Sequence, residues 1–254
     1  MNTHQLIFEL TPFSISISEL QGTNATQKAM LLFSGKTEHE MKGELTDFFQ
    51  NQSFLNSYTD YSLSWVSDQS VLIPMSIFKN EYATTFFETC FVRKSLLSSV
   101  SYNVIQEKSL VNVFEIPSWI TPFFVRKFPR IVILHGLTSL IRGEQDYPGK
   151  GHFVHLAIYK QFVYILIKEN HHIQFSNSFS YKTADDVLYY TSFVLKQESL
   201  SVDMCTLKIH LAAECNNDIT ADFIENWNLI SDFKQINRLP ITPNSLVKHH
   251  LSCV

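Results

Sequence analysis

The chain states one short pattern twice, and this repeat limits its fold more than any other feature. Phe33-Ser34-Gly35-Lys36-Thr37 recurs as Phe179-Ser180-Tyr181-Lys182-Thr183. Each copy follows alternating apolar and polar residues, as in strands with one covered face, and precedes an amphipathic helical pattern. Two half-length copies of one layout predict a duplicated fold with a cleft between its halves.

The first half of the chain begins with a hairpin whose turn is marked by Pro12. Thr37 and Glu40 have the spacing of a capping box, which places the start of a helix at Thr37. The elements predicted for this half are strands over 5–11, 13–19, 29–33 and 61–66, a helix after Thr37 and a helix over 80–91. The order is β-β-β-α-β-α.

The second half of the chain follows the same order, and Thr183 is the predicted N-cap of its first helix. Its predicted elements are strands over 152–159, 162–169, 173–181 and 206–213, a helix after Thr183 and a helix over 220–230. Such halves form mixed sheets with helices packed on them. Residues 101–150 add two strands, a short helix from Ser118, an apolar strand over 131–134 and another helix. Pro148-Gly149-Lys150-Gly151 predicts a linker, so we expect domains at 1–147 and 148–254.

Composition narrows the function classes. In 254 residues, 45% are hydrophobic and 17% charged, as in ordered globular proteins. The net charge is −4 with scattered Lys and Arg, so we expect no nucleic-acid partner. The chain shows no secretory signal and no apolar run of roughly 18 residues. Its four Cys lack metal-site spacing. We expect a cytoplasmic protein without stable membrane anchoring.

The tandem β-β-β-α-β-α order resembles the actin-like ATPase superfamily, which includes actin, the seventy-kilodalton chaperones and the sugar kinases. Within it, the size and order of elements look most like an uncharacterised bacterial family that has lost the nucleotide motifs. The resemblance spans essentially the whole chain. It implies an α/β (α+β) fold of two ribonuclease-H-like subdomains, with an inter-lobe cleft.

In that superfamily, the first turn of each half carries an Asp and glycines that hold Mg²⁺ and phosphate. The corresponding turns here, 9–14 and 157–161, contain no glycine. Pro12 lacks an N–H donor, and Phe13 and Tyr159 would crowd a phosphate. The resemblance therefore implies that ATP hydrolysis is lost, and we expect no cofactor. The candidate cleft residues are Glu9, Thr11, Ser14, Asp68, Lys160 and Glu214.

Two other chemical interpretations exist. The Ser34–Thr37 segment resembles the end of a phosphate-binding P-loop, but Met30 stands where the first glycine is needed, so a helix cap is favoured. Glu9, Glu40 or Glu44, and Asp68 fall on elements that carry metal-binding carboxylates in ribonuclease-H-like enzymes. Glu40 is already explained by capping.

The segment 118–128 carries more aromatic surface than a short helix needs. Trp119, Phe123, Phe124 and Phe128 form a candidate patch for a protein partner or a second copy of the chain, although burial of these side chains in the core is favoured. The leading hypothesis is a non-catalytic, degenerate actin-like protein that acts as a protein-binding or assembly module. The alternative is a phosphotransferase/ATPase or a metal-dependent nuclease that uses the inter-lobe cleft.

Overall fold

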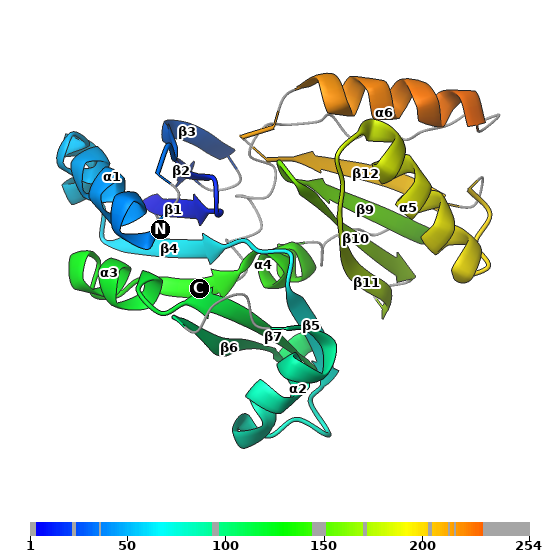
Figure 1. The fold of residues 1–254 in the computed structure, drawn as a ribbon, viewed down its shortest axis with the longest axis horizontal. Coiled ribbons are helices and arrows are strands. Elements are labelled where there is room, and N and C mark those ends of the chain that lie inside the picture. The colour runs from blue at the N-terminus through cyan, green and yellow to red at the C-terminus, as the bar shows by residue number, and fades with distance from the viewer. Residues whose placement is uncertain are drawn as a thin grey trace.

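The chain folds into two lobes that lie side by side (Figure 1). This computed structural model describes residues 4–21, 24–35, 37–92, 97–143, 151–169, 172–202, 205–212, 214–215 and 217–230. The predicted order of strands and helices is confirmed in the second half, and in the first half up to β4 (Asp60–Trp65), after which the chain forms a strand that was not predicted. The predicted linker residues 148–150, and with them the proposed domain boundary, lie outside the described residues.

A five-stranded mixed sheet in the order β3-β2-β1-β4-β8 forms the centre of the first lobe. Its strands are β1 (His4–Leu10), β2 (Ser14–Gln21), β3 (Asn24–Leu32), β4 (Asp60–Trp65) and β8 (Val132–His135). The first three are antiparallel, while β4 and β8 run parallel to β1. Helices α1 (Glu38–Gln50) and α3 (Ile120–Lys127) share a core cluster with one face of this sheet.

A second, three-stranded antiparallel sheet is inserted after β4. It consists of β5 (Ser70–Pro74), β7 (Leu110–Pro117) and β6 (Ser98–Ile105), and α2 (Ala83–Cys90) packs on it. The predicted helix over 80–91 thus exists but belongs to the insertion. The helix that leads the chain back to the large sheet is α3, which precedes β8.

The second lobe contains a four-stranded sheet in the order β11-β10-β9-β12. Its strands are β9 (His152–Ile158), β10 (Phe162–Glu169), β11 (His172–Ser180) and β12 (Cys205–Leu211). Helices α5 (Ala184–Gln197) and α6 (Asn217–Ile230) cover one face, where Val187 and Phe223 are fully buried.

Among the described helices of the chain, none is long and apolar enough to cross a membrane.

Matching backbone hydrogen bonds confirm the duplication. In each lobe the first hairpin closes through one bond, and the fourth strand is tied to the end of the first by another. The corresponding bonds are Thr11 N to Ser14 O (2.9 Å) and Tyr159 N to Phe162 O (2.9 Å), and Val66 N to Leu10 O (2.8 Å) and Ala212 N to Ile158 O (3.0 Å). The two hairpin turns are therefore structural equivalents.

The repeated Thr residues begin equivalent helices. The Thr37 hydroxyl accepts a hydrogen bond from Glu40 N, and the Glu40 carboxylate accepts one from Thr37 N. Thr183 and Asp186 make the same reciprocal pair at the start of α5. Because each box satisfies two N–H groups that a helix start leaves unpaired, both copies fix the same strand-to-helix junction.

The repeated Phe residues, in contrast, are not equivalent. Phe33 N donates to Phe13 O (2.8 Å), and the matching bond of the second lobe is Tyr181 N to Gln161 O (3.0 Å), two positions after Phe179. Phe33 follows the end of β3, whereas Phe179 lies within β11. The first lobe therefore carries two extra residues between strand and helix.

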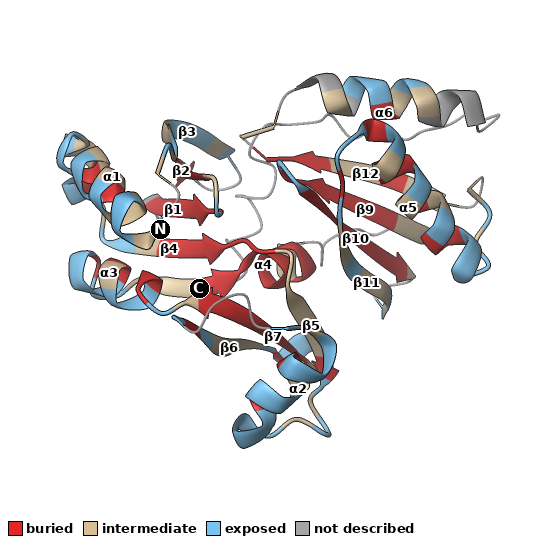
Figure 2. Ribbon diagram, in the orientation of Figure 1, coloured by how far each residue is buried: buried red, intermediate tan, exposed pale blue. Residues whose placement is uncertain are grey.

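Helix α4 (Gly136–Gly143) lies between the lobes (Figure 1) and is almost entirely buried (Figure 2). Leu137 and Ile141 share one apolar cluster with Tyr159 and Tyr164 of the second lobe. The Tyr164 hydroxyl donates to the backbone oxygen of Ser67. The lobes thus meet through a packed interior and not only through the chain that connects them.

Candidate functional site

Both hairpin turns meet at one carboxylate. Glu214, which follows β12, accepts hydrogen bonds at Oε2 from Thr11 Oγ1 (2.7 Å) and Ser14 Oγ (2.5 Å). Its Oε1 accepts a bond from Lys160 N (3.3 Å). Thr11 and Ser14 belong to the first-lobe turn and Lys160 to the second-lobe turn, so the Glu214 side chain bridges the lobes. Four of the candidate cleft residues are therefore in direct contact.

The first turn is shaped by Thr11. Its Oγ1 accepts hydrogen bonds from the backbone N–H groups of Phe13 and Ser14, each at 3.0 Å. A threonine side chain that bonds its own turn in this way uses the N–H groups of the turn internally. Pro12, between them, contributes no donor. The turn thus directs hydroxyl groups, and not a ring of N–H groups, toward Glu214.

Glu9 lies on β1 and is 7% exposed. Burial, together with the neighbouring charge of Glu214, raises the pKa of Glu9 to about 8. Burial and the charge of Glu9 raise the pKa of Tyr159 well above its usual value. At neutral pH, Glu9 and Tyr159 are therefore both uncharged, and the site avoids two facing carboxylates.

A cavity of about 890 Å³ opens on the second-lobe side of the first turn. Asp68 and Lys160 line it, and the Lys160 Nζ atom lies 5.4 Å from the ring centroid of Phe13. The backbone oxygen of Asp68 also accepts a bond from Ser178 Oγ, which ties β11 to the first lobe. Asp68 thus faces a different space from Glu9, which is not among the lining residues.

The carboxylates of the nuclease hypothesis do not converge. Glu44 accepts hydrogen bonds from Ser34 N (3.1 Å) and Gly35 N (2.7 Å), and the hydroxyl and N–H groups of these residues lower its pKa. Glu40 caps α1. Across the described part of the chain, no three His, Cys, Asp or Glu side chains are placed to hold one metal ion.

The same bonds explain the P-loop-like segment. The N–H of Gly35, which would face a phosphate in a P-loop, donates to the Glu44 carboxylate instead. The preference for a helix cap over a phosphate loop therefore agrees with the geometry at Thr37. Lys36 lies outside the described residues.

The proposed aromatic patch is mostly core, which corrects the patch interpretation. Trp119, Phe124 and Phe128 are only 7%, 0% and 3% exposed. The rings of Phe124 and Phe128 pack on Phe8, with centroids 5.8 and 4.9 Å apart. Phe123 is half-buried and lines a groove of about 640 Å³ beside α1. The four side chains do not form one exposed surface.

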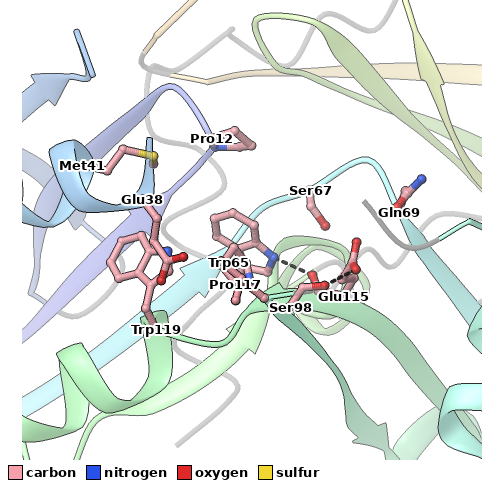
Figure 3. A pocket seen from close by; sticks show the side chains of 11 residues that line it. Pro12, Glu38, Met41, Trp65, Ser67, Gln69, Ser98, Glu115, Pro117 and Trp119 are labelled. Carbon is pink, nitrogen blue, oxygen red and sulfur yellow. Dashed lines mark hydrogen bonds between the residues drawn. The ribbon is translucent and has the colours of Figure 1, made fainter. Parts of the chain in front are cut away.

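A cavity that the sequence did not reveal lies where the large sheet meets the inserted sheet (Figure 3). Its volume is about 250 Å³. Residues from five separate segments line it: Pro12, Glu38, Met41, Trp65, Ser67, Gln69, Leu97, Ser98, Glu115, Pro117 and Trp119. Since neighbours in the cavity are tens of residues apart in sequence, no local pattern signals it.

Ser67 also touches a buried histidine, in a pair that looks like a nucleophile and its base. Ser67 Oγ lies 3.2 Å from His135 Nε2, while Leu137 N donates to His135 Nδ1 (3.3 Å). Because Nδ1 accepts, Nε2 carries the proton and donates to Ser67. Burial lowers the pKa of His135 to about 3. The imidazole is thus neutral and in the wrong tautomer to activate Ser67.

The fold is that of the actin-like ATPases, as the resemblance implied. A protein of unknown function with this fold from Bacteroides thetaiotaomicron superimposes with a TM-score of 0.80 at 20% identity, covering 100% of this chain and 97% of that one. A chain of the PilM-PilN type IV pilus biogenesis complex gives a TM-score of 0.52 at 10% identity, over 97% and 90% of the two chains. These identities establish the fold alone.

The sequence comparisons identify one family. No functionally curated protein matches the chain significantly. A family model described as "Protein of unknown function (DUF3822)" matches residues 2–225.

Proposed function

The chain belongs to the DUF3822 family of proteins of unknown function, and we propose that it is a degenerate actin-like protein that works by binding another protein or by assembling. On this proposal it acts in the cytoplasm and does not turn over a nucleotide. The observation that carries the proposal is the Glu214 carboxylate, which takes hydrogen bonds from both hairpin turns.

The resemblance to actin-like ATPases implies that these turns are where phosphates would bind. Here the hydroxyl groups of Thr11 and Ser14 donate to Glu214, so the bonds that a phosphate oxygen would accept are already made. A phosphate would also meet a like charge. At an effective dielectric constant of about 20, two like charges about 4 Å apart repel by about 4 kcal/mol. Glu214 thus opposes phosphate through both occupancy and charge.

If no nucleotide binds, the features that could serve a function are the two-lobed fold and the exposed surface. On α5, Tyr189 and Phe193 are 63% and 43% exposed, and their rings stack with centroids 6.1 Å apart. Exposed aromatic pairs of this kind favour protein contacts. An actin-like chain also occurs in the PilM-PilN complex, which supports the use of this fold as a partner-binding frame.

Calorimetric titration with Mg-ATP and Mg-ADP tests the loss of nucleotide binding. We expect no heat of binding for the natural chain. Glu214→Ala should remove the competing carboxylate and allow weak binding, whereas Glu88→Ala, on the exposed face of α2, should not. Micromolar affinity of the natural chain, followed by phosphate release, would end the proposal.

Light scattering after size-exclusion chromatography tests whether the chain assembles with copies of itself. If the α5 pair mediates self-association, the apparent mass should rise with concentration and this rise should be absent in a Tyr189→Ala, Phe193→Ala variant. A natural chain that stays monomeric at every concentration would exclude assembly and leave binding to another protein as the proposed role.

The enzyme alternative rests on the 890 Å³ cavity, where Asp68 and Lys160 face one space. An ATPase, phosphotransferase or nuclease activity that uses it should be lost in Asp68→Asn. An activity that is unchanged in both Asp68→Asn and Glu9→Gln would exclude these residues as its catalytic groups.

A further inference from the structure

The cavity between Trp65 and Trp119 has the chemistry of a cation site, and we propose that it binds a small organic cation that carries N–H donors on an apolar body. An alkylammonium, an arylalkylammonium or a guanidinium group meets this description. The inference concerns a different place from Glu214 and does not rest on the proposed function.

The size of the cavity sets the size of the ligand. Its volume of about 250 Å³ is smaller than the roughly 300–1,000 Å³ of sites that hold drug-sized molecules. Figure 3 shows Trp65, Trp119, Glu38 and Glu115 around it, with Gln69 at the far side. A ligand the size of one amino-acid side chain or a small arylamine fits this space.

The walls are aromatic and fixed in place. Trp65 and Trp119 are 4% and 7% exposed, and Trp65 Nε1 donates to the backbone oxygen of Glu115 (2.9 Å). Because that donor is occupied, the Trp65 ring offers a ligand its π system. The negative face of an indole ring attracts a cation more strongly than the other aromatic side chains do.

The protein already places one ammonium group in this neighbourhood. The Lys42 Nζ atom lies 5.5 Å from the ring centroid of Trp119 and 2.9 Å from Glu38 Oε1. Lys42 lines the groove beside α1, which shares Trp119 with the cavity, and is not among the cavity residues. An indole with a nearby carboxylate therefore serves as a cation site within the chain itself.

The charged groups of the described lining are both carboxylates. Glu38 and Glu115 contribute carboxylates, and the described lining contains no Lys, Arg or His. Gln69 Oε1 is a buried atom without a hydrogen-bond partner. Ser98 Oγ donates to Glu115. Ser67, Gln69 and Trp119 carry neutral donors, so the preference for a cation rests on the two carboxylates and the two indole rings. A ligand that supplies N–H groups and positive charge completes this set.

An anion or a neutral hydrocarbon fits the lining of the cavity less well than a cation does. An anion would face two carboxylates in a partly apolar space. A neutral hydrocarbon would fill the volume but leave Gln69 Oε1 without a hydrogen-bond donor, which disfavours its binding. The observations therefore favour a cationic donor over both.

Fluorescence titration of the full chain tests the proposal. A Trp227→Phe background restricts the signal to Trp65 and Trp119. The probes are 2-phenylethylamine, protonated at neutral pH, and two compounds of similar shape, 2-phenylethanol and 3-phenylpropanoate. We expect saturable quenching by the amine, about tenfold weaker binding of the alcohol and no binding of the carboxylate.

Variants locate the binding. Glu115→Gln and Gln69→Met should each weaken the amine about tenfold, while Glu88→Gln, exposed on α2, should leave it unchanged. If Glu115→Gln alters the circular dichroism spectrum, Gln69→Met alone decides. Equal affinity for the alcohol and the amine, or unchanged amine affinity in Gln69→Met, overturns the proposal.

The source of the cation is resolved by two further probes, N-acetylarginine amide and a short peptide with one central arginine. If 2-phenylethylamine or N-acetylarginine amide binds more tightly than the peptide, the ligand is a small molecule. Tighter binding of the peptide assigns the side chain of a protein. If neither a guanidinium nor an amine quenches the fluorescence, the proposal is wrong.

Discussion

Replacing Glu9 by Gln should remove a pH dependence from the stability of this protein. The pKa of Glu9 rises from 4.5 to about 8 on folding, because the side chain is buried and lies near Glu214. Below about pH 4.5 both the folded and the unfolded chain hold the proton. Between about pH 4.5 and 8 only the folded chain holds it, so the free energy of unfolding falls as pH rises through this window.

The size of the effect follows from the shift. A rise of 8 − 4.5 = 3.5 pKa units, at about 1.36 kcal/mol each, corresponds to about 5 kcal/mol lost across the window. This is of the order of the total stability of a domain, about 5–15 kcal/mol. Glu9→Gln keeps the shape of the protonated acid and does not titrate. The variant should therefore match the natural chain in acid and exceed it in alkali.

Urea unfolding followed by circular dichroism at about pH 5, 6.5 and 8 gives the free energies. Histidines also titrate over this range, so the quantity to compare is the difference between the natural chain and the variant. Glu88→Gln, an exposed substitution on α2, should follow the natural chain at each pH. Parallel curves for Glu9→Gln and the natural chain would refute the assignment of a protonated, buried Glu9.

Three further outcomes follow from the packing and the caps. Thr37→Ala removes the capping box of α1 and should cost about 1 kcal/mol of unfolding free energy, measured in urea. Phe124→Ala opens a cavity beside Phe8 and should cost about 3–5 kcal/mol, whereas Val125→Ala, 41% exposed, should change the same measurement by about 0.5 kcal/mol or less. Tyr164→Phe leaves the backbone oxygen of Ser67 without this donor and should cost about 1–3 kcal/mol; an unchanged midpoint would contradict the buried bond between the lobes.

The features that sequence predicted are local ones. The helix caps at Thr37 and Thr183 need only the residue three positions later, and the hairpins need only alternation and a turn. Strand β5 was missed because it has only five residues and pairs with β7, about forty positions further on. Without that strand, α2 had no visible sheet to pack on and was assigned to the main fold.

The site was only partly predictable for the same reason. The hairpin turns suggested Thr11 and Lys160, but the bond from Thr11 to Glu214 joins residues 203 positions apart. For Phe124 and Phe128 the favoured interpretation, core burial, is correct, but the sequence did not show what covers them. Their helix alone shows aromatic excess, while the Phe8 ring that covers them lies on β1. Which side of a helix is covered is decided by elements that its own sequence does not contain.

Helix α4 has a consequence for how the molecule is made. It precedes the second lobe in the chain, yet Leu137, Leu140 and Ile141 are buried in a cluster completed by Tyr159, Tyr164 and Leu166. During synthesis these leucines and isoleucine leave the ribosome before the strands that will cover them. Until β9 and β10 are synthesised, the apolar side chains of α4 are therefore exposed in the nascent chain. We expect this intermediate to be prone to aggregation and to be bound by chaperones.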